Sequence, residues 1–119
     1  MTTPFQTRLK EIGIDPIWYL EEAKKRAKQS LALNWKTLTW SHRKGKKLSI
    51  LNDNGKSISF GSSINNDFII WSELERRGEV PQYYASRKRQ VFWKSHTAMK
   101  NWNPTDSYSP NTLSLIILW

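Results

Sequence analysis

The hydrophobic positions at the start of the chain repeat with the period of an α-helix. Phe5 and Leu9 share one face of a first short helix, which Gly13 can end. Asp15-Pro16 is typical of a helix start, because aspartate caps the first turn and proline suits its first position. An apolar stripe at spacings of three and four follows, and it predicts a second helix that runs to about Leu31.

The pattern then changes to the alternation of β-strands. Residues 34–43 alternate in polarity, and so do the two segments 48–51 and 56–60, which flank the hairpin signal Asn54-Gly55. Phe68 to Trp71 is a short run of bulky apolar residues, which we interpret as a further, more buried strand. The sequence therefore predicts an antiparallel β-meander.

The remainder of the chain mixes a helix, a loop and an apolar end. Ser72 can cap a short helical turn that Gly78 stops, and residues 82–94 are expected to form a longer helix. The loop that follows contains Trp102 as an expected anchor, and residues 112–119 form an apolar tail that must be docked.

These elements predict the α+β class: N-terminal helices, a small antiparallel β-meander, then a helix and a docked apolar C-terminal segment. The length of 119 residues suits one domain. We divide it into a helical part (1–33), the β-meander (34–71) and the helix, loop and tail (72–119).

The apolar tail has two interpretations. It can close the core of its own domain, or it can be an anchor that docks into a partner. Its residues are Leu115, Ile116, Ile117, Leu118 and Trp119.

The charge of the chain is strongly positive and unevenly distributed. The net charge is +9, from 19 Lys and Arg against 10 Asp and Glu. Between residues 24 and 47 every charged residue is basic: Lys24, Lys25, Arg26, Lys28, Lys36, Arg43, Lys44, Lys46 and Lys47. Such a segment can bind phosphates, an acidic protein or anionic headgroups, or can simply be a solvated face. Residues 43–47 also resemble a nuclear import signal, although a cationic hairpin turn has the same composition.

Trp35 and Trp40 stand within this basic segment. If these tryptophans are exposed, they can stack on nucleic-acid bases or contact another protein. If they point inward, they are core residues of a strand.

Asp67 is the one acidic residue set among apolar neighbours, and it needs a partner. We expect a structural ion pair between Asp67 and Arg87 rather than an active site.

No catalytic, metal or cofactor site is expected. The chain has no cysteine, and its two histidines, His42 and His96, are remote from each other and match no metal-binding pattern. We also expect no cleaved signal peptide and no membrane-spanning segment.

The second half of the chain, residues 57–119, resembles an uncharacterised family of short basic proteins encoded by large eukaryotic DNA viruses. The resemblance rests on Phe60-Gly61, Asp67-Phe68, Tyr84-Ala85-Ser86-Arg87, Trp102, and Leu113-Ser114 with Leu118-Trp119. The family usually has Arg-His where this chain has Arg87-Lys88, and its chains usually continue a few residues beyond the final tryptophan. The resemblance implies a viral origin and a place in the virion, but no activity.

The expected function is therefore that of a non-enzymatic structural or adaptor protein, a minor or internal component of a virion assembled inside the host cell. Its expected partners are other virion or capsid proteins. The alternative is a basic nucleic-acid-binding protein that tethers or condenses the viral genome, and contact with a membrane surface is a further alternative.

Overall fold

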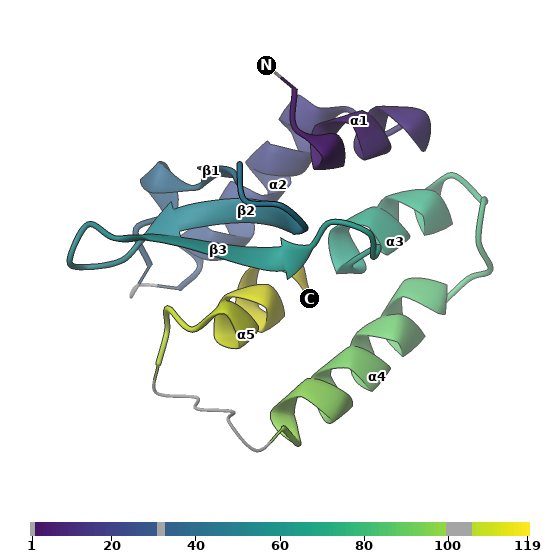
Figure 1. Cartoon of the computed structure of the whole chain (residues 1–119). Helices are drawn as coiled ribbons and strands as arrows, with labels where there is room; N and C mark the ends of the chain where they lie inside the picture. The colour runs from purple at the N-terminus through teal and green to yellow at the C-terminus, as the bar shows by residue number, and fades with distance from the viewer. Residues whose placement is uncertain (1, 31–32, 100–105) are drawn as a thin grey trace.

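The computed structural model describes residues 2–30, 33–99 and 106–119 of the chain. The fold is α+β, as predicted (Figure 1). Along the chain, helices precede and follow a three-stranded antiparallel sheet. The elements are α1 (Pro4–Glu11), α2 (Pro16–Lys28), η1 (Trp35–Thr37), β1 (Thr39–Trp40), β2 (Lys46–Leu51), β3 (Ser57–Ser62), α3 (Phe68–Arg76), α4 (Tyr84–Thr97), α5 (Pro110–Leu113) and η2 (Ser114–Leu118).

Helices α1 and α2 begin with the caps that their sequences provide. The Thr3 side chain accepts a hydrogen bond from the Gln6 amide, and the Gln6 side chain accepts one from the Thr3 amide. Asp15 caps α2 by accepting from the Ile17 amide at 3.1 Å. Helix α2 ends at Lys28, and Leu31, where the predicted helix ended, lies outside the described residues.

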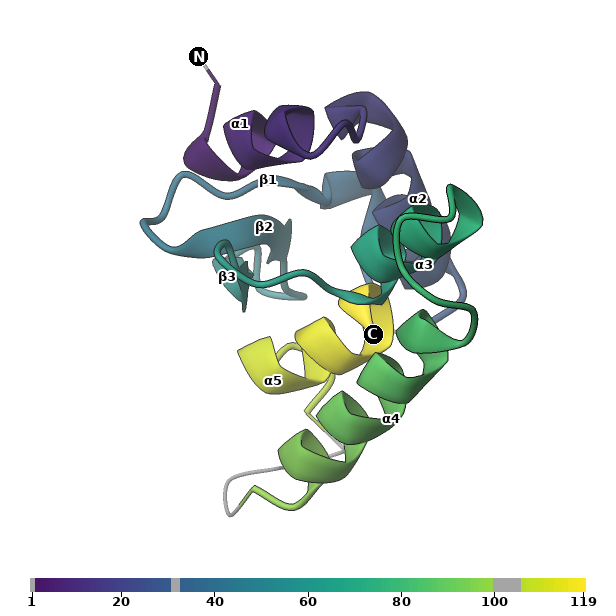
Figure 2. The ribbon, with the colours of Figure 1, turned by 90° about the vertical axis from the view of Figure 1, so that its right-hand side faces the viewer.

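The sheet has the order β1-β2-β3, and the predicted hairpin joins β2 to β3. Its turn is closed by Asn52, whose side-chain oxygen accepts from the Asn54 and Lys56 amides, while Gly55 takes a positive φ of 77°. Strand β2 is central and is buried along most of its length. Figure 2 shows the sheet between α1 and α5.

The prediction of one strand over residues 34–43 was wrong. Its first part is the 3-10 turn η1, and only Thr39–Trp40 pairs with β2. Thr37 explains the difference, because its hydroxyl donates to the Asn34 carbonyl at 2.7 Å and accepts from the Leu51 amide at 3.0 Å. A side chain thus replaces a backbone bond that a longer strand would have made.

The prediction of a strand over Phe68–Trp71 was also wrong. These residues are the first turn of α3, and Ser72 lies inside that helix instead of capping a separate one. Asp67 is the reason: one carboxylate oxygen accepts from the Ile70 amide at 3.0 Å and caps the helix. A short apolar run fits a strand and a buried helical turn equally well, so the cap decides between them.

Asp67 also makes the central polar contact of the fold, and its partner is Lys47, not Arg87. Its second carboxylate oxygen accepts from the Tyr19 hydroxyl at 2.5 Å and from Lys47 Nζ at 2.8 Å. The Lys47 and Asp67 side chains are 2% and 0% exposed, whereas Arg87 is exposed on α4. The predicted Asp67–Arg87 pair is therefore absent, and a lysine assigned to the binding surface is a core residue.

Burial shifts the pKa values of Tyr19 and Lys47 in this cluster. It raises the pKa of the Tyr19 hydroxyl well above its usual value, and the negative charge of Asp67 adds to the effect. Burial lowers the pKa of Lys47, and Asp67 opposes that shift. Tyr19 therefore keeps its proton and donates to Asp67.

The apolar tail packs in the core of its own domain. Leu115, Ile117 and Leu118 are buried, Trp119 is 8% exposed, and Ile116 is half-buried. The tail is helical, with η2 in the wide π form continuing α5, and it lies beside α2 and β3. The structure therefore agrees with the first interpretation, in which the tail closes the core of its own domain.

Asp67→Asn should destabilise the protein strongly, because it leaves the Lys47 ammonium buried without its countercharge. We expect a loss of about 3–5 kcal/mol in the free energy of unfolding, measured by urea denaturation. Glu22→Gln is the matched control, since Glu22 pairs with Lys25 at 3.3 Å on the surface, where such pairs contribute about 0–1 kcal/mol. Equal losses in the two variants would contradict the central role of Asp67.

Gly61→Ala should cost more than Gly45→Ala, although both glycines have a positive φ, of 82° and 79°. A Cβ at Gly61 would lie 2.7 Å from Leu118 Cδ1 and 3.2 Å from Lys47 Cβ, whereas one at Gly45 meets nothing within 4 Å. We expect about 1–2 kcal/mol at Gly45 from the backbone alone. Overpacking should add about 1–3 kcal/mol at Gly61. Equal unfolding midpoints in urea would refute this packing argument.

Candidate binding surface

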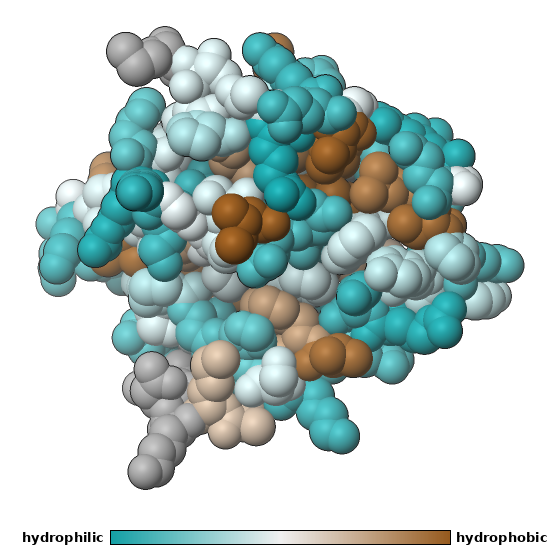
Figure 3. All heavy atoms as spheres, turned by 45° about the vertical axis from the view of Figure 1, so that its right-hand side comes forward, coloured by the Kyte–Doolittle hydropathy of each residue, from teal (hydrophilic) through white to brown (hydrophobic). Residues whose placement is uncertain are grey.

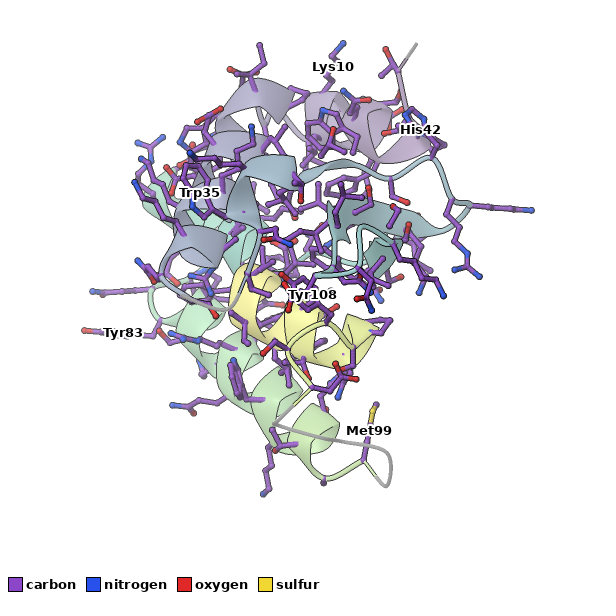
Figure 4. The ribbon with its side chains drawn as sticks, turned by 90° about the vertical axis from the view of Figure 1, so that its left-hand side faces the viewer. Lys10, Trp35, His42, Tyr83, Met99 and Tyr108 are labelled. Atoms are coloured by element: carbon purple, nitrogen blue, oxygen red, sulfur yellow. The ribbon has the colours of Figure 1, made fainter. Side chains whose placement is uncertain are left out.

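Helix α4 is the most exposed long element of the described structure. Of its 14 residues, Ala85 is the buried one, while Tyr83 just before it is 65% exposed and Val91 is 68% exposed. Figures 1 and 2 show α4 along one edge of the molecule, below α3 and to the right of α5. In Figure 4, Tyr83 and Met99 mark its two ends. Phe92 and Trp93 are half-buried and pack against the core, and the opposite side of α4 is exposed and free for contact.

The start of α4 is fixed by α3. Tyr83 adopts a left-handed conformation with φ of 68°, and the Ala85 amide donates to the Glu75 carboxylate at 2.9 Å. A carboxylate at the first turn satisfies an otherwise unpaired amide and suits the positive end of the helix dipole. The rings of Trp71 and Tyr84 meet edge to face, with their centroids 5.0 Å apart.

Four exposed cations project from α4, and no acidic residue lies in it. Within the described residues, none of the four forms an ion pair with a carboxylate. They are Arg87, Lys88, Arg89 and Lys94. The α3 carboxylate of Glu73 does not offset them, because it is paired with Arg76 and Arg77. We call α4 with these four side chains the α4 surface.

Figure 3 shows this side of the molecule as largely hydrophilic, with separate small apolar spots instead of one continuous apolar face.

Two arginines from different helices converge on one ring. The guanidinium carbon of Arg89 lies 4.9 Å from the centroid of Phe68, and that of Arg26, on α2, lies 5.5 Å from it. Burial lowers the pKa of Arg26, and the positive charge of Arg89 adds to that effect. An anion near this pair would relieve their repulsion, so the α4 surface favours negatively charged partners.

Two members of the predicted basic segment are not free surface cations. Lys47 is in the core, and Arg26 is partly buried with its Nε donating to the Ile117 carbonyl at 2.5 Å. The rest are exposed or half-exposed but lie on different elements: Lys24, Lys25 and Lys28 on α2, Lys36 on η1, Arg43 and Lys44 before β2, and Lys46 at its start.

The two tryptophans of that segment have different surroundings. Trp40 packs with Tyr19 at 6.3 Å and with Phe5 at 6.2 Å between ring centroids, so it belongs to the core and is not a free stacking platform. Trp35 is half-buried, and the ammonium groups of Lys28 and Lys36 lie 5.0 and 5.7 Å from its ring.

Sequence reasoning missed the α4 surface, although its signal was present. Counted over residues 48–119, the basic residues nearly cancel against the acidic ones. In the structure the acids are on α3, the turns and the loops, whereas α4 has none. A charge count for each predicted helix would have found this surface.

The described residues contain no cluster of three or more side chains that could hold a metal ion. His42 lies at the far end of the molecule from Met99, the second residue after α4, which carries His96 (Figure 4). Among the described helices, none is long and apolar enough to cross a bilayer.

Comparison of the chain with protein-family models, with curated proteins and with solved structures gives no match.

Removing cations from α4 should leave stability unchanged, because they make no ion pairs in the described structure. For Arg87→Gln with Lys94→Gln, we expect a change within about 0.5 kcal/mol in the free energy of unfolding, measured by urea denaturation. Glu75→Ala should instead lose about 1 kcal/mol, because it leaves the Ala85 amide without its acceptor. A large loss in the double variant would show that these cations are structural.

Proposed function

We propose that the protein is a non-enzymatic structural adaptor that docks through the α4 surface onto an acidic surface of another protein. We place it as a minor or internal component of the virion of a large DNA virus, assembled inside the host cell. The observation that carries the adaptor role is α4 itself: four exposed cations, no acid and one buried side chain. The place in the virion follows from the resemblance of residues 57–119, a region that includes all of α4.

The chemistry beside the cations favours a protein partner. Tyr83 and Val91 are exposed on or next to α4 and can enter a protein interface, where tyrosine is enriched. Arginine on α4 is suited to bidentate pairing with carboxylates. Trp40, which would have to be free to stack on a base, is half-buried and packs against Tyr19 and Phe5.

A nucleic-acid partner is the second candidate. It is favoured by the same uninterrupted positive charge on a helix of 14 residues, which is about 21 Å long and can follow a phosphate backbone. The two candidates differ in how their binding depends on salt. Phosphate contacts release counterions, so affinity falls steeply as salt is raised, whereas an interface with an apolar centre retains part of its affinity.

The adaptor proposal predicts that the protein stays with the shell of purified particles when the genome is removed. Particles of the encoding virus are opened, treated with nuclease and washed in about 0.15 M NaCl, where a screening length of about 8 Å leaves contacts between oppositely charged surfaces intact. We expect the protein to remain with the shell proteins, as quantified by mass spectrometry. Release together with the genome would overturn the adaptor role in favour of genome tethering, and absence from untreated particles would overturn the virion assignment.

The role of α4 is tested with charge-matched variants. Virus carrying Arg87→Gln with Lys94→Gln should lose the protein from its particles, whereas Lys44→Gln with Lys56→Gln should retain it. All four side chains are exposed, and both variants remove two positive charges. Equal retention of the two variants would mean that α4 is not the docking surface.

A further inference from the structure

A groove of about 740 Å³ lies beside α4 and is a candidate ligand site in its own right. It is bordered by the start of β2, by the residues after β3, by the second half of α4 and by the C-terminal helices. Its volume falls in the range of small-molecule pockets, about 300–1,000 Å³. Its lining combines aromatic rings, cations, and amide and hydroxyl groups.

The groove is positively charged. The charged residues that line it are Lys46, Lys47 and Lys88, and no aspartate or glutamate lines it. Lys47 is bound to Asp67, but within the described residues Lys46 and Lys88 form no ion pair. Lys88 Nζ lies 5.8 Å from the ring centroid of Trp71, another lining residue. The groove therefore favours a ligand with negative charge.

An aromatic stack runs into the groove. The ring of Phe92 is parallel to Trp119, with an interplanar angle of 7° and centroids 4.2 Å apart. It is also parallel to His96, at 16° and 3.6 Å. Two rings this close cannot share one face of Phe92, so the order is Trp119, Phe92, His96. Among the described residues no further ring stacks on His96, which is half-buried and lines the groove, so its outer face is the place for another flat ring.

The hydrogen bonds of His96 hold its ring in this position. Its Nδ1 lies 3.0 Å from the Phe92 carbonyl, an acceptor, and therefore carries a proton. Asn111 and Ser114, from the C-terminal helices, and Asn65 after β3 bring polar side chains to the groove wall. These groups can pair with the edge of a base and with sugar hydroxyls.

We infer that this groove binds a nucleoside phosphate, with the base continuing the Trp119–Phe92–His96 stack and the phosphate between Lys46 and Lys88. The ligand is a free mononucleotide or one unit of a single strand, since both present the same base, sugar and phosphate. The site does not depend on the partner proposed for α4, so either proposal can fail without the other.

The test is titration of the full-length protein with adenosine monophosphate by calorimetry. We expect saturable 1:1 binding with a dissociation constant below about 1 mM. Ribose 5-phosphate, which lacks the base, should bind at least about fivefold more weakly. Adenosine, which lacks the phosphate, should bind about tenfold more weakly or worse. No binding of the nucleotide, or equal binding of ribose 5-phosphate, would overturn the proposal.

Matched lysine variants locate the site. Lys46→Gln should weaken nucleotide binding about tenfold or more, whereas Lys44→Gln, two residues away and outside the groove, should not change it. Equal affinities in the two variants would overturn the assignment. His96→Ala should cost about fivefold or more through the lost ring, and unchanged thermal unfolding of each variant confirms that it is folded.

A last titration distinguishes the two sources of the ligand. A decamer of deoxythymidine that binds more tightly than the mononucleotide by well over the statistical factor of about ten identifies a single strand as the ligand. Equal affinity per nucleotide identifies a free nucleotide. Both outcomes support the groove as the site, and failure of both ligands overturns it.

Discussion

The fold depends on one buried carboxylate. Asp67 is 0% exposed and receives three hydrogen bonds, from the Tyr19 hydroxyl on α2, the Lys47 ammonium on β2 and the Ile70 amide on α3. An ion pair out of contact with water is costly to form unless its remaining acceptors are satisfied, and here each carboxylate oxygen has a donor. The Lys47 ammonium also lies 5.1 Å from the ring of Phe5 on α1. One side chain thereby fixes the start of α3 relative to the sheet and to both N-terminal helices.

The exposed features of the molecule follow from that fixed point. Helix α3 carries Glu75 and Trp71, which hold the first turn of α4. The apolar tail fills the space between α2 and β3, and it closes against Gly61, where a side chain would collide with it. With α3 and the tail in place, α4 is held by the buried Ala85 and by the half-buried Phe92 and Trp93. Its cations and the groove beside it are left for interactions outside the chain.

The sequence predicted those parts of the fold that local signals determine. Asp15-Pro16 gave the start of α2, and the Asn-Gly turn gave the β2–β3 hairpin. What it did not predict depends on contacts between distant residues. Lys47 belongs to a run of lysines whose composition predicts a solvent-exposed turn. It is a core residue because it contacts Asp67, 20 positions later in the chain. Arg87 is as far from Asp67 in sequence as Lys47 is, and the contact was assigned to it because Arg87-Lys88-Arg89 is a cluster of cations. The groove joins segments of β2, α4 and η2, and no local pattern predicts such a site.

The slight burial of α4 has a dynamic consequence. Apart from Ala85, Phe92 and Trp93, α4 buries little apolar surface, and an element with few buried contacts opens more readily than a core strand. Its amide hydrogens should exchange with solvent much faster than those of β2, which is central in the sheet. A molecule bound to α4 or in the adjoining groove would suppress that opening. The two surfaces are thus coupled through α4: occupation of either lowers the cost of ordering the helix for the other, whereas Lys88, which belongs to both, can pair with only one anion at a time.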